Sequence, residues 1–142
     1  MFRVLVPVDE SEDRAETAAD VVESLPGDPE AIEAVLLNVF EEFEVHDEGA
    51  TVDSGDIYDE EAFPDSVGRI EDRLAAAGIT VRKRREHGEP AEEIADVADE
   101  LDVDRIVMSG RNRRPTGKVL FGSVTQSVLL DVDRPVTVLA SD

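Results

Sequence analysis

The stretch FRVLVPVDESEDRAETAADVVESL, residues 2–25, decides the fold class of this chain. Residues 2–8 form an apolar, β-branched run that is typical of a buried strand. After the polar residues 9–11 comes a helical stripe of apolar residues, made of Ala15, Ala18, Ala19, Val22 and Leu25. A buried strand that leads directly into an amphipathic helix is the building unit of parallel α/β sheets.

The same alternation continues to the end of the chain. Further strands are expected at residues 34–40, 79–86, 105–109 and 135–140, and further helices at 64–77, from 90 onward and at 123–130. Gly78 suits the end of the second helix, and Pro90 suits the first turn of the third. Five strands separated by four helices predict an α/β fold, a doubly wound, Rossmann-like open five-stranded parallel sheet with helices on both faces.

The chain shows no internal repeat and no domain boundary, so residues 1–142 are predicted to form a single domain. Residues 41–62 contain ten acidic residues without any period, which indicates a solvated acidic loop. A calcium site at 53–61 is disfavoured, because its carboxylates do not follow the spacing of a calcium loop.

The composition limits the function classes. The absence of cysteine excludes a disulfide scaffold and a thiol nucleophile. No apolar run approaches the roughly 20 residues of a membrane span, and the N-terminus lacks a signal-peptide layout, so a soluble cytoplasmic protein without membrane partners is predicted. The net charge of −21 argues against nucleic acid as a partner. Only two of the 14 basic residues are lysine, and twelve are arginine. An acidic surface that is poor in lysine indicates adaptation to a salt-rich cytoplasm of the halophilic type, where salt screens the repulsion among carboxylates.

One stretch departs from the acidic background. In MSGRNRRPTGKVLFGSV, residues 108–124, four cations stand within eight positions: Arg111, Arg113, Arg114 and Lys118. The run ends at the expected start of a helix, whose free N–H groups attract anions. Gly122 would let an anion approach the backbone, and Ser123 would add a hydroxyl while capping the helix. We favour phosphate binding here over simple charge balance.

The loop that follows the first strand, VDES at 8–11, would face the same cleft if the first and fourth strands are neighbours. A second cationic run, RKRR at 82–85, lies on the third strand and favours a charged edge strand that resists pairing with another sheet. His46 and His87 are expected at the surface, and no nucleophile–base pair is visible, so whether the protein is an enzyme stays open.

Five segments carry a resemblance to a known family: VLVPVDESEDRAETA, LLNVFEE, GEPAEEIADVADELDVDRIVMSGR, LFGSVTQSVL and RPVTVLA, in this order. On these segments the chain resembles the universal stress protein (UspA-like) family over nearly its whole length. The resemblance implies the HUP-type strand order 3-2-1-4-5, which places the first and fourth strands side by side. It also implies a homodimer through strand 135–140, with a downstream protein partner that is unknown.

Nucleotide-binding members of that family carry the motif G-x2-G-x9-G-[S/T]. Its closing pair corresponds to Gly122 and Ser123, whereas its first two glycines are replaced by Ser109 and Asn112. Ser is small and Asn tolerates left-handed backbone angles, so these are the least damaging replacements. The resemblance implies an adenine-nucleotide site formed by thirteen residues: Pro7, Val8, Asp9, Val39, Met108, Ser109, Gly110, Asn112, Arg113, Arg114, Gly122, Ser123 and Val124.

The implied cofactor is ATP or AMP, with or without Mg²⁺ held by Asp9 through the phosphates. Three residues have structural alternatives: Asp9 could cap the first helix together with Ser11, while Val39 and Met108 could be ordinary core. The function predicted by the resemblance is an adenine-nucleotide-binding regulator of the stress response. The alternatives are a nucleotide-free dimeric interaction protein of the same family and a slow ATP hydrolase.

Overall fold

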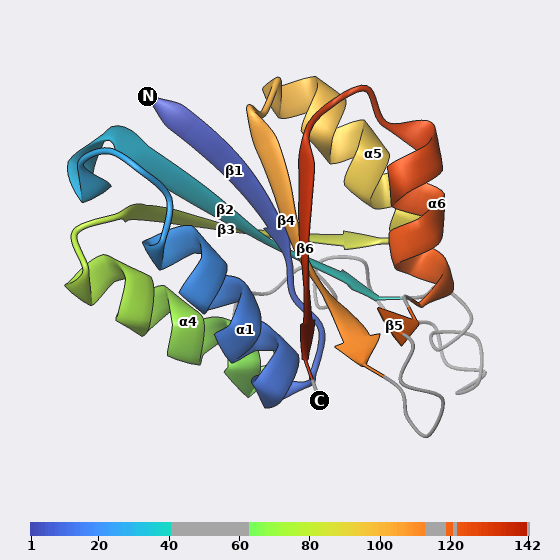
Figure 1. Cartoon of the computed structure of the whole chain (residues 1–142), viewed down its shortest axis with the longest axis horizontal. Helices are drawn as coiled ribbons and strands as arrows, with labels where there is room; N and C mark the ends of the chain where they lie inside the picture. The colour runs from blue at the N-terminus through green and yellow to red at the C-terminus, as the bar shows by residue number, and fades with distance from the viewer. Residues whose placement is uncertain (41–62, 113–118, 121, 142) are drawn as a thin grey trace, which may run out of the picture.

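A computed structural model of the protein describes residues 1–40, 63–112, 119–120 and 122–141. The described strands form one sheet with the order β3-β2-β1-β4-β5, in which β6 also pairs with β4 (Figure 1). The strands are β1 (Phe2–Pro7), β2 (Ile32–Phe40), β3 (Thr80–His87), β4 (Arg105–Asn112), β5 (Val119–Leu120) and β6 (Val136–Ser141). The predicted acidic loop at 41–62, with His46, and the cations Arg113, Arg114 and Lys118 lie outside the described residues.

The predicted fold class is confirmed. Five strands run parallel in the predicted order, with β6 as the fifth strand of the prediction. The sequence did not predict β5, whose Val119 and Leu120 pair antiparallel with Asn112 and Arg111. This pairing also extends β4 three residues beyond its predicted end at 109. A two-residue strand is too short to show a period of its own, so nothing in the sequence indicates it.

Four helices form the two outer layers of the described structure. They are α1 (Glu12–Glu23), α4 (Asp65–Ala76), α5 (Pro90–Leu101) and α6 (Ser123–Asp131), and a short 3₁₀ helix, η1 (Pro29–Ala31), precedes β2. Helices α1 and α4 cover one face of the sheet, and α5 and α6 cover the other (Figure 1). Each lies within two residues of its predicted bounds, and Gly78 follows α4 with φ +93°, the left-handed region that glycine adopts without strain.

Strand β1 is the centre of the core. Val4, Leu5 and Val6 have no exposed surface. Val4 and Val6 pack with α1 and α4, whereas Leu5 packs with α5 and α6 on the opposite face. Successive side chains of a strand point to opposite faces, so an uninterrupted apolar run can fill both halves of the core. None of the helices in the described part of the chain is long and apolar enough to cross a membrane.

Strand β3 lies at one edge of the sheet, as predicted from its four cations. Three of the four cations are also engaged by carboxylates. Arg82 Nε lies 2.9 Å from Glu33, Lys83 Nζ lies 3.3 Å from Glu71, and Arg84 Nη1 lies 2.7 Å from Glu100. The hydrogen bond from Arg84 lowers the pKa of the Glu100 carboxyl. The cationic run at 82–85 therefore places positive charge on an edge strand and also neutralises nearby carboxylates.

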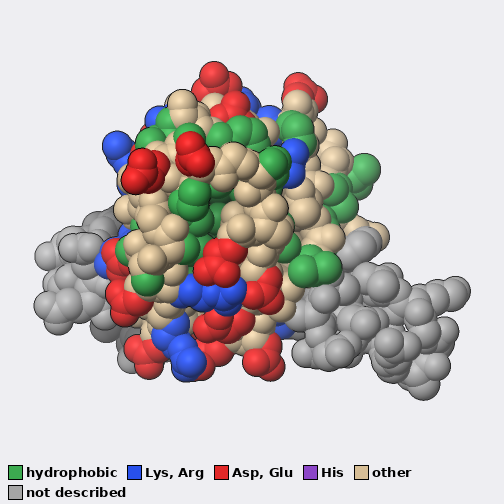
Figure 2. All heavy atoms as spheres, turned by 60° about the vertical axis from the view of Figure 1, so that its left-hand side comes forward, with side chains coloured by type: hydrophobic (Ala, Val, Ile, Leu, Met, Phe, Trp, Pro, Cys, Tyr) green, Lys and Arg blue, Asp and Glu red, His purple; other side chains and the backbone are tan. Residues whose placement is uncertain are grey.

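Arg73 joins the two helices on the α1 side. Its guanidinium lies 2.6 Å from Glu16, 2.5 Å from Asp20 and 2.7 Å from Glu23, all on α1. Hydrogen bonds to Glu23 and Asp20 raise the pKa of Arg73, so it stays charged. In Figure 2, Lys and Arg side chains lie among Asp and Glu side chains over the lower half of the molecule. One cation thus offsets the repulsion among three carboxylates on one helix.

We expect Arg73→Met to lower the free energy of unfolding by about 1–2 kcal/mol at low salt, because three α1 carboxylates lose their counter-ion. Urea unfolding at 0.05 M and 1 M NaCl measures the change, and the loss should shrink at 1 M, where screening is short-ranged. Arg69→Met is the control, because Arg69 is 59% exposed and should contribute little. Equal losses at both salt concentrations would contradict an electrostatic role.

Candidate functional site

The carboxyl ends of β1 and β4 meet at one edge of the sheet. Val4 pairs with Arg105 and Leu5 pairs with Ile106, so the two strands are parallel neighbours. The predicted adjacency of the first and fourth strands is therefore confirmed. Because the strands are parallel, the loop after β1 and the chain that leads from β4 to α6 leave the sheet at the same edge, which is where ligands bind in open α/β sheets.

A cavity of about 500 Å³ lies at this edge. It is lined by Pro7, Val8, Asp9, Arg14, Ala15, Leu37, Val39, Pro90, Ile94, Met108, Ser109, Gly122, Ser123, Val124 and Thr125. Nine of the thirteen predicted site residues belong to this lining: Pro7, Val8, Asp9, Val39, Met108, Ser109, Gly122, Ser123 and Val124. Of the other four, Gly110 and Asn112 lie within the extended backbone of β4, and Arg113 and Arg114 lie outside the described residues.

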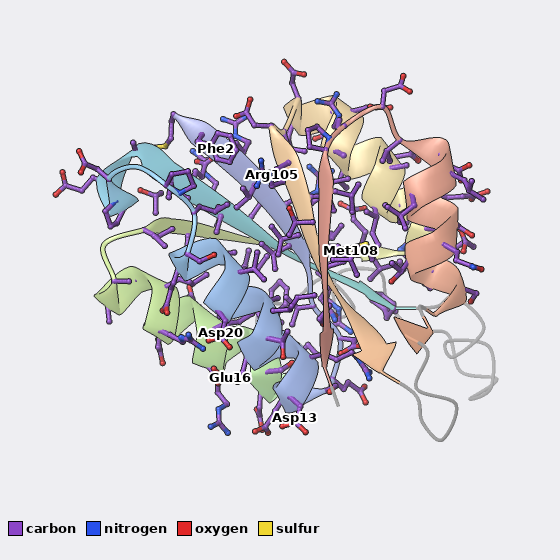
Figure 3. The ribbon with its side chains drawn as sticks, viewed as in Figure 1. Phe2, Asp13, Glu16, Asp20, Arg105 and Met108 are labelled. Atoms are coloured by element: carbon purple, nitrogen blue, oxygen red, sulfur yellow. The ribbon has the colours of Figure 1, made fainter. Side chains whose placement is uncertain are left out.

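One wall of the cavity is apolar. Met108 lies on β4 and is 6% exposed, packed into the core on the side of α5 and α6 (Figure 3). Val39 at the end of β2 and Val124 on α6 are half-buried against the same cluster. Val39 and Met108 therefore belong to the core and line the cavity at once, so the two interpretations of these residues do not exclude each other.

The start of α6 forms another part of the cavity wall. Gly122 is the residue that caps this helix, with φ −67° and ψ 166°, so Ser123 is the first helical residue and the predicted capping by Ser123 is wrong. No side chain of the described residues caps α6. A Cβ built on Gly122 would meet no atom of the described residues within 4 Å, so this part of the fold leaves space at the position. The first N–H groups of α6 thus face an open site that suits an anion.

Two buried polar side chains hold the loop after β1. Asn38 Nδ2 donates to the carbonyl of Val8 over 2.9 Å, and Ser66 Oγ donates to the carbonyl of Asp9 over 2.6 Å. Asn38 is 5% exposed and Ser66 is 1% exposed. Neither residue was predicted from the sequence, although a lone Asn in the apolar run AVLLNVF is a usable signal. Ser66 gives no comparable signal, because it lies 57 residues from its partner.

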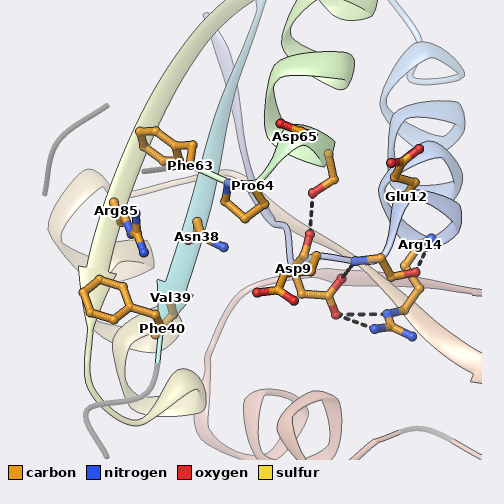
Figure 4. Close-up of a pocket in the computed structure, with 13 residues that line it drawn as sticks. Asp9, Glu12, Arg14, Asn38, Val39, Phe40, Phe63, Pro64, Asp65 and Arg85 are labelled. Atoms are coloured by element: carbon orange, nitrogen blue, oxygen red, sulfur yellow. Dashed lines mark hydrogen bonds and ion pairs between the residues drawn. The ribbon is translucent and has the colours of Figure 1, made fainter. Parts of the chain in front are cut away.

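The Asp9 carboxylate points back toward α1 (Figure 4). Its Oδ1 accepts the N–H of Ser11 over 2.9 Å, and its Oδ2 accepts Nε and Nη2 of Arg14 over 3.0 and 2.7 Å. Ser11 caps α1, because its side chain accepts the N–H of Arg14 over 3.2 Å. The predicted capping by Asp9 is therefore wrong, and that by Ser11 is confirmed. Arg14 is a further site residue that the sequence analysis missed.

A second hollow of about 630 Å³ adjoins the cavity between the ends of β1 and β2 and the start of α4 (Figure 4). Asp9, Arg14 and Val39 line both. At its far side the Arg85 guanidinium lies 4.3 Å from the centre of the Phe40 ring. His87, expected at the surface, is half-buried instead: it ends β3 and stacks on Phe40. Among the described residues no group of three or more His, Cys, Asp or Glu side chains could hold a metal ion.

The comparisons with known proteins agree with this fold. The model of the universal stress protein family matches residues 1–140. A curated universal stress protein from Mycolicibacterium smegmatis is 36% identical over 86 residues, which is 58% of this chain and 66%, slightly less than two thirds, of that protein. The structure of the hypothetical protein MJ0577, whose biochemical function was assigned from its structure, has a TM-score of 0.77 at 30% identity and covers 99% of this chain and 96% of that one.

Two further structures with the same fold contain nucleotides. A universal stress protein from Archaeoglobus fulgidus is in complex with dAMP; its TM-score is 0.67 at 23% identity, over 97% of both chains. A universal stress protein in complex with cAMP has a TM-score of 0.68 at 16% identity and covers 99% of this chain and 98% of its own. At these identities the likeness shows the fold, and the ligands are those of the two relatives.

We expect Ser66→Ala to lower the free energy of unfolding by about 1 kcal/mol and to loosen the loop after β1, because the Asp9 carbonyl loses its buried donor. Ser24→Ala is the matched control, since Ser24 Oγ donates to the Val21 carbonyl over 2.7 Å far from the cavity. Hydrogen exchange of the amides at 8–11 should accelerate only in Ser66→Ala. Unchanged exchange there would show that Ser66 does not position the loop.

Proposed function

The chain belongs to the universal stress protein family, and from that premise we propose that it binds an adenine nucleotide, ATP or AMP, and acts as a ligand-gated regulator of the stress response. The observation that carries the proposal is the cavity between the carboxyl ends of β1 and β4, which includes the start of α6, where no side chain of the described residues caps the helix. We also place the protein in the cytoplasm of a salt-adapted cell, on the strength of its net charge of −21 and its preference for arginine over lysine.

The residues present suit each part of a nucleotide. The volume of about 500 Å³ lies within the usual range for small-molecule sites. The apolar wall with Val39 and Met108 suits an adenine ring. The free N–H groups of α6, beside Gly122, suit phosphate oxygens. Asp9 Oδ1, which accepts only the Ser11 N–H among the described groups, suits a ribose hydroxyl.

The nucleotides bound by two relatives support this assignment. The replacement of the first two motif glycines does not argue against it, because Ser109 lines the cavity and Asn112 continues β4 in extended backbone. The cations Arg113 and Arg114 would extend the site toward distal phosphates. If a magnesium ion accompanied the phosphates, Asp9 would be the residue to hold it, since the described residues offer no other carboxylate on the cavity wall.

We further propose that the protein forms a homodimer through β6. This strand pairs only with β4 among the described strands, so one of its edges is available to a second copy. Leu139 on β6 is 45% exposed, an apolar side chain that a partner would cover. Sedimentation equilibrium is expected to give twice the chain mass of 15.5 kDa. A mass of one chain at micromolar concentration would contradict the dimer.

Thermal unfolding with ATP, ADP and AMP tests nucleotide binding. At a ligand concentration about 100-fold above Kd, stabilisation should reach about 2.7 kcal/mol and raise Tm by several degrees. Mass spectrometry of the denatured protein should also detect a co-purified nucleotide. A flat response to every adenine nucleotide would favour the nucleotide-free interaction protein, and steady release of phosphate from ATP would favour the slow hydrolase.

We expect Gly122→Asp to weaken nucleotide affinity by about tenfold or more, because it places a carboxylate at the start of α6 where phosphate oxygens would bind. Gly68→Asp is the matched control: a Cβ at Gly68 also meets nothing within 4 Å, but Gly68 lies on α4 away from the cavity. Both variants are measured by isothermal titration with AMP and ATP. Unchanged affinity in Gly122→Asp would place the site elsewhere.

A further inference from the structure

Arg14 stands out in the cavity because neither the cationic run at 111–118 nor the glycine motif includes it. Its guanidinium donates from Nε and Nη2 to Oδ2 of Asp9 over 3.0 and 2.7 Å. Both residues line the cavity and the adjoining hollow (Figure 4). The side chain of Arg14 is 26% exposed and that of Asp9 is 55% exposed, so the pair forms part of an accessible wall.

The cavity is locally neutral in an acidic molecule. Among the described residues that line it, Asp9 and Arg14 alone are charged, although the chain carries a net charge of −21. The adjoining hollow has in addition three acidic residues, Glu10, Glu12 and Asp65, against one further cation, Arg85, on its wall. Without Arg14, an anion in the cavity would be repelled by the unneutralised Asp9 carboxylate and by the acidic residues of the adjoining hollow. Arg14 therefore removes the main electrostatic obstacle to an anionic ligand.

The pair of Arg14 and Asp9 leaves several hydrogen-bonding groups available to a ligand. A guanidinium has five N–H groups, and Arg14 uses two of them on Asp9. The other three have no acceptor among the described residues. The Asp9 carboxylate receives three hydrogen bonds, one from Ser11 and two from Arg14. It keeps about one of its four acceptor positions. The pair thus offers the cavity several cationic donors and one acceptor.

Placement of the loop does not by itself require Arg14. The carbonyls of Val8 and Asp9 are already held by Asn38 and Ser66, and Ser11 caps α1. If Arg14 served only to hold the loop, it would duplicate what Asn38, Ser66 and Ser11 already do. A guanidinium on an accessible wall with free donors is instead suited to oxygens of a phosphate, which it can bind through two parallel hydrogen bonds.

We propose that Arg14 makes ligand affinity depend on ligand charge: it neutralises Asp9 and donates its remaining N–H groups to phosphate oxygens of the bound nucleotide. The inference rests on the proposed function and deepens it, because it assigns a phosphate contact to α1 in addition to the start of α6. It also makes the site selective for phosphorylated nucleosides over the nucleoside itself.

The test compares adenosine, AMP and ATP by isothermal titration at 0.1 M and 1 M NaCl, on the wild-type protein and on Arg14→Gln. Gln keeps a hydrogen bond to Asp9 within reach but removes the charge. We expect adenosine to change less than about twofold, AMP to weaken by about tenfold, and ATP by more. The differences should shrink at 1 M NaCl, where screening is strong.

Two further variants separate charge from folding. Arg134→Gln is the matched control, because it removes one cation at the opposite end of the strands, where Arg134 contacts Asp99 and Asp102. It should leave all three affinities unchanged. Arg14→Lys keeps the charge without the forked donors and should restore part of the loss for AMP and ATP.

The outcomes distinguish the two proposals. If the wild-type protein binds and Arg14→Gln loses affinity equally for all three ligands, Arg14 is only a structural contact and this inference is wrong, while the proposed function stands. The same holds if ATP affinity is unchanged in Arg14→Gln. If the wild-type protein binds none of the three ligands, the proposed function is wrong and the inference falls with it.

Discussion

The placement of β1 between two parallel neighbours is the constraint on which the rest of the structure depends. Strand β1 pairs with β2 on one side and with β4 on the other, and Val4, Leu5 and Val6 are completely buried. Since all three strands point the same way, their carboxyl ends open at one edge. Another strand order would separate the Asp9 loop from the start of α6, and the cavity would not form.

Arginine is the second constraint, because it allows so acidic a chain to pack. Glu33 on β2 is 4% exposed, and it lies between Arg3 on β1 at 2.5 Å and Arg82 on β3 at 2.9 Å. Arg73 and Arg84 each contact more than one carboxylate. A planar guanidinium can serve several carboxylates at once, which a lysine ammonium does less well. The bias toward arginine therefore has a structural explanation within the fold, in addition to the proposed habitat.

The sequence predicted the order and type of the main elements because buried strands and amphipathic helices leave strong periodic signals. The neighbourhood of β1 and β4 came only from the family resemblance, since no local pattern encodes which strands pair. The capping residue of the last helix was predicted one residue too late: α6 begins at Ser123, so its cap is Gly122 and not Ser123. Ser66 could not be found from the sequence, because its role depends on a tertiary contact with Asp9 across 57 residues. Arg14 lies only five residues after Asp9, but a charged residue in the polar first turn of a helix carries no signal that it pairs with Asp9. Asn38 alone among the missed residues was visible, as a polar residue in a buried apolar run.

The chemistry of the cavity favours a ligand that carries a hydroxyl next to an anionic group. The start of α6 supplies about half a positive charge over its first turn, which is too little by itself to overcome a nearby free carboxylate. With Asp9 neutralised by Arg14, the same helix end becomes the dominant charge on the cavity wall among the described residues. Asp9 then has one acceptor position for a hydroxyl, while Arg14 and α6 provide donors for an anion. Free phosphate would use only the donors, whereas the proposed nucleotide ligand, in which a ribose hydroxyl lies near a phosphate, would use both. The pairing of Asp9 with Arg14 thus explains how one acidic residue can be part of an anion site.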